Sequence, residues 1–181
     1  MADDLIARSV AEATIHAPLA AIDLTEWVFT LTDSDYQACS KNHIAAATSV
    51  TSEGKRMSIN VERVGNLMVQ HYVEDIAERN RCRLVSQSDS IGPDIGSLVK
   101  LVVIWSFAAE AIDADTTRFI NSVEVHAAPG YRSALEKRGV PFDKASEAAS
   151  QAVIAHNREE TPFFARDIGR KAVANRWAGR T

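Results

Sequence analysis

The spacing of hydrophobic and polar positions changes along the chain, and the change separates a sheet-forming middle from a helical end. From His43 to Ala127, short segments of β-type composition alternate with turn signals such as SEGK (52–55) and DADT (113–116). These segments predict six strands, at residues 43–52, 56–64, 67–77, 81–90, 97–111 and 117–127. Because the connections are short, an antiparallel meander is favoured over parallel strands joined by crossovers.

The segment before this meander predicts one more strand and two short helices. ARSVAEATIHA (7–17) is compatible with a strand that ends before Pro18. Asp23, followed three residues later by Glu26, reads as a capping box that opens a helix over LTEWVFTL (24–31). Thr32 or Asp33 can cap a second short helix.

The segment after the meander predicts a long helix. Gly139-Val140-Pro141 ends a loop, and the composition is strongly helical from Phe142 onward. Residues at steps of three and four place one stripe along this helix: Ala145, Ala148, Ala149, Ala152, Val153 and His156.

This order of elements predicts an α+β fold, with a curved antiparallel sheet of about seven strands wrapped around a long C-terminal helix. The helix is the only element large enough to cover one face of such a sheet, and the two short helices can plug an end. A length of 181 residues suits one domain, residues 1–181. The space between sheet and helix is a natural site for an apolar small molecule.

Two short motifs carry a resemblance to a known family. TIHAPLAAI (14–22) is similar to the Ala-Pro end of that family's first strand, and LTDSDY (31–36) to its Leu-Thr-Asp entry to the second short helix. With this element order, the chain resembles the helix-grip superfamily, which includes lipid-transfer domains related to the steroidogenic acute regulatory protein (START-like domains), birch pollen allergen relatives, and bacterial polyketide cyclases and aromatases. It departs from the pattern in the extra AAIDLTEW material and in Pro162. The resemblance implies either hydrophobic ligand binding or chemistry by a few polar residues in the cavity.

Composition and charge exclude several classes of function. A net charge of −4 argues against nucleic acid as a partner, and no apolar stretch is long enough to span a membrane. Neither a signal nor an anchor is visible, so a cytoplasmic location is the default expectation. The two cysteines, Cys39 and Cys82, lack the spacing of a metal knuckle. Glycine loops for phosphates and zinc-helix motifs are not found in the sequence, and we expect no cofactor.

Strand alternation predicts which side chains face the space under the helix. In residues 97–111 the odd row, with Trp105 and Phe107, is apolar and should face inward. In residues 117–127 the inward row contains Phe119 and, as a polar exception, Asn121. A buried amide there must either bond to a neighbouring group or be positioned for a ligand.

Two other strands and two strand-end histidines are assigned on weaker patterns. In residues 67–77 the odd row favours an inward His71, where desolvation would make it a neutral base, although an edge or surface position is the alternative. In residues 56–64 the apolar row of Met57, Ile59 and Val61 should be buried, which leaves Glu62 outside. His43 and His16 lie at element ends and are expected to be solvated.

The stretch AHNREETPFFARD (155–167) continues the stripe of the long helix. Helical steps lead from His156 to Glu159 or Glu160 and then to Phe163 or Phe164, so His156 should face the sheet. A histidine and a glutamate from one turn are an incomplete metal set, with no clear third ligand beyond His71, so no metal site is expected. Pro162 either kinks one continuous helix or starts a new one after Thr161.

These observations lead to one hypothesis and two alternatives. We expect the protein to bind a hydrophobic or aromatic small molecule, with catalytic groups His71, His156 and Asn121 and a pocket of Trp105, Phe107, Phe119, Phe163, Phe164 and Glu160. The resemblance implies cyclase- or lyase-type chemistry without a cofactor. The alternatives are a carrier or sensor of a lipophilic ligand without turnover, and a co-chaperone-like interaction module. A homodimer stays open.

Overall fold

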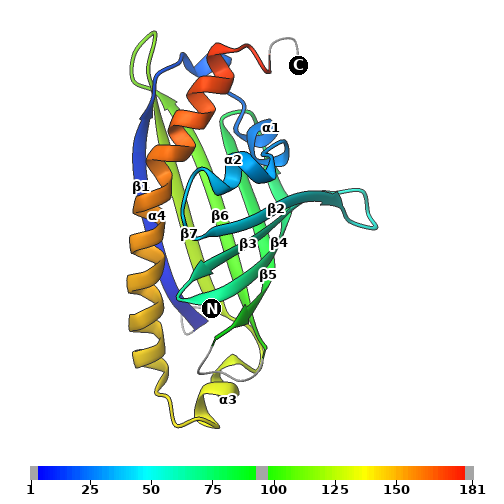
Figure 1. Ribbon diagram of the computed structural model, residues 1–181, viewed down its shortest axis with the longest axis vertical. Coiled ribbons are helices and arrows are strands. Elements are labelled where there is room, and N and C mark those ends of the chain that lie inside the picture. The colour runs from blue at the N-terminus through cyan, green and yellow to red at the C-terminus, as the bar shows by residue number, and fades with distance from the viewer. Residues whose placement is uncertain (1–3, 93–97, 178–181) are drawn as a thin grey trace.

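The computed structural model describes residues 4–92 and 98–177 of the chain, and its centre is one antiparallel sheet (Figure 1). The sheet order is β1-β7-β6-β5-β4-β3-β2. Strands β2 to β7 therefore form the predicted meander, and β1 pairs with its last strand, β7. The expected start of a strand at residue 97 and most of the 91–96 turn lie outside the described residues. The strands are β1 Leu5–Ile15, β2 His43–Val50, β3 Arg56–Val64, β4 Asn66–Ala77, β5 Arg81–Ile91, β6 Val99–Ala111 and β7 Thr117–Ala127.

The two short helices near the N-terminus begin where side chains accept hydrogen bonds from free backbone N–H groups. The N–H of Glu26 donates to Asp23 Oδ1 at 2.9 Å at the start of α1, as predicted. The N–H of Asp35 donates to Thr32 Oγ1 at 3.1 Å, so Thr32 is the cap of α2. The sequence analysis missed α3 between β7 and the last helix. The helical segments are the 3₁₀ turn Leu19–Ala21, α1 Leu24–Phe29, α2 Asp33–Gln37, α3 Tyr131–Glu136 and α4 Phe142–Val173.

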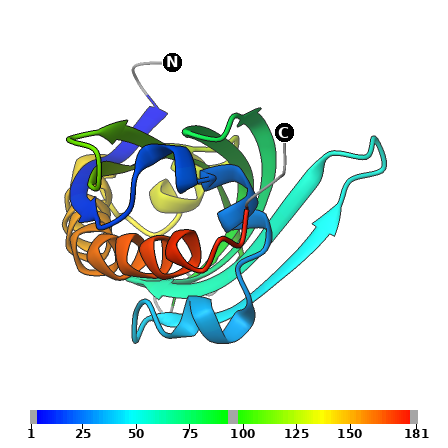
Figure 2. The ribbon, with the colours of Figure 1, turned by 90° about the horizontal axis from the view of Figure 1, so that it is seen from above.

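The sheet curls around a space that α4 runs alongside (Figure 2). Seen from above, β1 lies next to α4 and the sheet bends away from it and around, with α1 over one end and α2 at the side, next to β2. The inward rows of β6 and β7 are those predicted: Trp105, Phe107, Phe119 and Asn121 are all buried. The alternation of apolar and polar residues therefore gave the correct inner face for the two central strands.

Pro162 lies within one continuous helix, since α4 runs unbroken from Phe142 to Val173. Of the two alternatives at Pro162, a single continuous helix is therefore the one observed. Pro162 is exposed, whereas its neighbours Thr161 and Phe164 are buried. A proline on the solvent side removes a backbone bond where the outer face of a curved helix is already stretched, so the residue fits a helix that follows a twisted sheet.

An aromatic cluster fills the end of the space beneath α1. Trp27 packs edge-on against Phe107, Phe119 and Phe164, with ring centroids 5.4, 6.3 and 5.1 Å away. Its indole Nε1–H donates to Asp167 Oδ2 on α4 at 2.9 Å, which satisfies the one polar atom of this buried ring. The cluster fixes α1 and α4 on the sheet and closes one end of the space.

Within the described ranges, none of the helices combines the length and the apolar character that crossing a bilayer would require.

Candidate functional site

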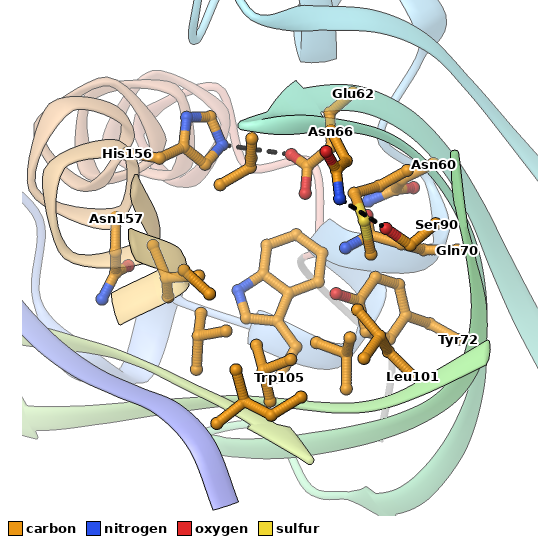
Figure 3. A pocket seen from close by; sticks show the side chains of 18 of the residues that line it. Asn60, Glu62, Asn66, Gln70, Tyr72, Ser90, Leu101, Trp105, His156 and Asn157 are labelled. Carbon is orange, nitrogen blue, oxygen red and sulfur yellow. Dashed lines mark hydrogen bonds and ion pairs between the residues drawn. The ribbon is translucent and has the colours of Figure 1, made fainter. Parts of the chain in front are cut away.

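A cavity lies between the sheet and α4, on the side of Trp105 away from the aromatic cluster (Figure 3). The centres of water-sized molecules can occupy about 100 Å³ of it, which is room for several waters or for part of a small organic molecule. Tyr36 of α2 lies in one wall and Tyr131 of α3 in another, so the cavity extends along the sheet between the short helices.

One wall of the cavity is apolar. It is made by the inward rows of β6 and β7, with additions from β1 and from the first half of α4. Figure 3 shows the indole of Trp105 rising from this wall toward the middle of the cavity. The side chains of this wall are Ile6, Leu101, Val103, Trp105, Val123, Val125, Ala149 and Val153. Two further apolar side chains, Val64 and Met68, line the cavity from β3 and β4.

The opposite wall is polar and comes mainly from β3, β4 and β5. Its side chains are buried or half-buried amides and hydroxyls that project into the same space as the indole (Figure 3). The phenol of Tyr72 also points inward, and burial together with the charges of Glu62 and Glu160 raises its pKa well above the ordinary value. The polar lining from these strands consists of Asn60, Glu62, Asn66, Gln70, Tyr72 and Ser90.

Four ionisable side chains meet where this polar wall reaches α4. His43 of β2 and Glu62 of β3 are cross-strand partners, and His156 and Glu160 lie one turn apart on α4. One ligand-type atom from each of the four lies within 4.8 Å of the others. We call His43, Glu62, His156 and Glu160 the His–Glu quartet; all four are buried, and all except His43 line the cavity.

The distances within the quartet are those of hydrogen bonds and close ion pairs. His156 Nε2 is 3.1 Å from Glu62 Oε2 and 3.3 Å from Glu160 Oε2. His43 Nε2 is 3.1 Å from Glu160 Oε2 and 3.7 Å from Glu62 Oε2. Each carboxylate therefore bridges both imidazoles.

Neighbouring groups orient the quartet. The Tyr36 hydroxyl donates to Glu62 Oε2 at 3.1 Å, and the Tyr36 carbonyl accepts from His43 Nδ1 at 2.7 Å. The rings of Tyr36 and His43 stack with centroids 3.8 Å apart. On the other side, Asn121 Nδ2 donates to Glu160 Oε1 at 3.1 Å, while its own oxygen accepts from Trp105 Nε1 at 2.8 Å. These bonds hold the side chains in defined orientations.

The quartet shifts the proton affinities of its members in opposite directions. Burial alone would lower the pKa of His156, but the hydrogen bonds and negative charges of Glu160 and Glu62 outweigh it and raise this pKa to about 10. Burial alone would raise the pKa of Glu160, but the hydrogen bonds from His156 and His43 lower it. At neutral pH His156 is therefore a cation held against carboxylates.

The structure brings some of the predicted site residues together. His156, Glu160 and Trp105 line the cavity, and His156 faces the sheet as expected. Asn121 follows the first of its two alternatives, since its amide bonds to Trp105, Glu160 and Thr161. The roles assigned to these residues stay proposals.

Other predicted residues lie outside the cavity. Phe107, Phe119 and Phe164 belong to the aromatic cluster, and Phe163 is 37% exposed. The inward orientation of His71 is wrong: the inner row of β4 is Met68, Gln70 and Tyr72, and His71 pairs with Ile59 on the outer face. In β4 the more hydrophobic row faces outward, and the inner row contributes Gln70 and Tyr72 to the polar wall of the cavity.

The sequence analysis also misplaced two members of the quartet. Glu62 was expected on the outer face of the sheet and His43 in solvent. In the structure Glu62 is only 8% exposed and His43 only 6% exposed. The face of β3 was chosen by hydrophobicity, which fails when a buried wall is polar and its charges are paired. The alternation itself was the available signal, because Ser58, Asn60 and Glu62 form one continuous polar row.

Comparison with known proteins places the fold. No family model matches the sequence, and no curated protein matches it. Among solved structures, the Zhui aromatase/cyclase of Streptomyces sp. R1128 superposes with a TM-score of 0.62 at 14% identity, over 96% of this chain and 98% of that one. The chain has the helix-grip fold.

Two further helix-grip structures are similar over part of their length. The di-domain aromatase/cyclase StfQ of the steffimycin pathway has a TM-score of 0.57 at 10% identity, over 96% of this chain and 54% of that chain. The di-domain protein BexL of the BE-7585A pathway has a TM-score of 0.50 at 16% identity, over 91% and 50%. The chain thus spans about half of each di-domain protein. At such identities the likeness concerns the fold alone.

Proposed function

We propose that the protein binds a partly apolar small organic molecule between the sheet and α4. The observation that carries this proposal is the pairing of two unlike walls, an apolar one around Trp105 and a polar one that ends at the His–Glu quartet. Ligand pockets are commonly apolar with a few polar groups that fix orientation. An aromatic ring against Trp105 with its oxygen atoms toward Gln70 and Asn60 would match both walls. The similar cavity-bearing fold of aromatase/cyclases supports an aromatic or polyketide-like class.

A second candidate function is turnover of such a ligand by proton transfer, as in a cyclase or lyase. It is favoured by one contact, the 3.1 Å approach of His156 Nε2 to Glu62 Oε2 in the cavity wall. A carboxylate there can accept a proton from a carbon next to a carbonyl, while the imidazolium donates a hydrogen bond to the carbonyl oxygen. A carrier needs only the cavity, whereas a cyclase also needs the Glu62 carboxylate and the His156 imidazole for proton transfer.

Filling the cavity tests the binding proposal. Val103 lines the cavity, while its neighbour Val102 on the same strand points to the other face. We expect Val103→Trp to abolish binding of 1-naphthol measured by calorimetry, and Val102→Trp to leave it within about threefold, since only the first removes the space. Equal binding by both variants, in protein shown to be folded by circular dichroism, would refute the proposal.

Exchange of α-hydrogens separates the carrier from the cyclase. 1-Tetralone in D₂O with the protein reports proton abstraction next to a carbonyl by NMR. If the quartet performs proton transfer, Glu62→Gln lowers the exchange rate by about 100-fold or more while 1-naphthol binding is retained. His71→Ala, on the outer face, is the matched control and should change neither. Absence of catalysed exchange in the unsubstituted protein favours the carrier.

A further inference from the structure

We propose that the His–Glu quartet is a binding site for one divalent transition-metal ion of the zinc type. Imidazole nitrogens and carboxylate oxygens are the ligands of such ions, and four of them converge here from three elements, β2, β3 and α4. The set that seemed incomplete in the sequence is completed by His43 and Glu62. This inference does not rest on the proposed binding of an organic molecule, because the four side chains of the quartet would hold the ion whether or not the rest of the cavity is occupied.

Four of the six separations within the quartet, those between a histidine and a glutamate, are close to the ligand–ligand distances around a tetrahedral ion. With metal–ligand bonds of about 2.0–2.1 Å, the edges of a regular tetrahedron measure about 3.3–3.4 Å. The four His-to-Glu separations are 3.1, 3.7, 3.1 and 3.3 Å. The His–His and Glu–Glu separations are at most 4.8 Å, so the four atoms must draw closer together to become ligands of one ion.

The hydrogen bonds around the quartet point the right atoms inward. The Tyr36 carbonyl can only accept, so the 2.7 Å contact places a proton on Nδ1 of His43 and turns Nε2 toward the carboxylates. A ligating histidine generally donates its other ring N–H to a carbonyl or carboxylate in this way. On Glu160, Asn121 occupies Oε1 and leaves Oε2 for the centre.

The charge of the quartet also fits a dication. Glu62 and Glu160 are buried, and across residues 4–92 and 98–177 their recorded ion pairs are all with His43 and His156. Buried carboxylates need compensating positive charge. One divalent ion bound to two neutral imidazoles supplies two positive charges, which balance the two carboxylates. Ions that prefer six oxygen ligands, such as Mg²⁺, fit this mixed nitrogen and oxygen set poorly.

Calorimetric titration of the metal alone tests the inference. Protein without a histidine tag is stripped with EDTA, dialysed and titrated with ZnCl₂, with MgCl₂ as the comparison ion. We expect one Zn²⁺ per chain and no measurable heat with Mg²⁺. His156→Gln and Glu62→Gln should each weaken Zn²⁺ binding by about 100-fold or more, because each removes a ligand. His126→Gln is the matched control: His126 also faces a glutamate, Glu124, at 3.4 Å, but in a half-exposed pair outside the quartet.

Absence of Zn²⁺ binding by the unsubstituted protein, or equal binding by the quartet variants and by His126→Gln, overturns the inference. If the quartet variants fail to fold, Co²⁺ added to the unsubstituted protein decides: intense visible absorption of a four-coordinate ion supports the site, and the weak bands of a hydrated ion refute it. Binding of 1-naphthol to the EDTA-treated protein is measured in parallel. If Zn²⁺ does not bind but 1-naphthol does, only the metal site is refuted. If 1-naphthol does not bind but Zn²⁺ does, only the proposed ligand binding is refuted.

Discussion

His156 Nε2 lies 3.1 Å from Glu62 Oε2, although the two residues are 94 positions apart in the chain. The contact joins α4 to β3 across the mouth of the curled sheet, at the point where the polar wall of the cavity begins. The charge of His156, the burial of Phe164 further along α4 and the hydrogen bonds of Asn121 to Glu160 should each affect the free energy of unfolding.

The stability of the metal-free protein should fall as the pH rises above 6.5. The pKa of His156 is about 10 in the folded chain, against an ordinary value of 6.5, so its stabilising charge is complete below pH 6.5 and is lost toward pH 10. The titratable groups that face it are Glu62 from β3, Glu160 from α4 and the His43 ring from β2. The pKa of Glu160 is lowered, so its contribution is present above its ordinary 4.5 and is lost in acid.

Urea unfolding in EDTA between pH 6.5 and about 8.5, below the thiol range, measures this effect. We expect the free energy of unfolding to fall by up to about 1.4 kcal/mol per pH unit, the limit for one proton. His156→Gln should show a flatter profile over the same range. Parallel profiles for the two proteins would show that His156 does not carry the charge.

The adjacent residues Phe163 and Phe164 should differ sharply in their contribution to stability. Phe164 is fully buried against Trp27 and Trp105, whereas Phe163 is 37% exposed. Phe164→Ala should lower the free energy of unfolding by about 3–5 kcal/mol, because it leaves a cavity in the aromatic cluster. Phe163→Ala should cost less than about 1 kcal/mol. Similar losses for the two variants, measured by urea unfolding, would mean that α4 is rotated about its axis and that Phe163 is as buried as Phe164.

Asn121 should matter for stability through the partners it satisfies. Asn121→Leu removes the acceptor of Trp105 and the donor to Glu160, and both of those groups stay buried. We expect a loss of about 2–4 kcal/mol in the free energy of unfolding. Ser122→Ala, the next residue on the opposite face of β7, should stay within about 0.5 kcal/mol and serves as the control. Two equally stable variants would count against the network.

The two thiols should be inert in the folded protein. Cys39 and Cys82 are buried, and burial raises their pKa values to about 12 and about 11, with carboxylates near Cys39 adding to its shift. Because the thiolate is the reactive form, Ellman's reagent at about pH 8 should react far more slowly with native than with guanidinium-unfolded protein. Rapid reaction of either thiol in the native state would contradict the burial described here.

The fold could be predicted because local patterns fix it. The rows through Trp105 and Phe119 are more apolar than the rows on the other face of their strands, the cap at Asp23 is a local motif, and the stripe toward His156 has helical spacing. Each of these signals lies within one element or one turn. The order of the elements then left few arrangements that could bury the sheet.

The polar wall could not be predicted in the same way. Alternation shows that Asn60 and Glu62 share a face, but which face is buried depends on partners from other elements. His43 and His156, which make the burial of Glu62 tolerable, lie 19 residues before it and 94 after it. The same reasoning failed for His71, whose apolar neighbours cover the outside of the sheet.

The cross-strand pairing of His43 with Glu62, set beside the one-turn spacing of His156 and Glu160, means that the quartet consists of two locally built halves. One half forms when the β2–β3 hairpin closes, and the other when the last helix coils. α4 packs mainly along β1, at the opposite edge of the sheet, so the two halves meet only when that helix docks. The quartet therefore connects the β2–β3 hairpin to α4, and its four side chains come together only in molecules in which α4 has docked on the sheet.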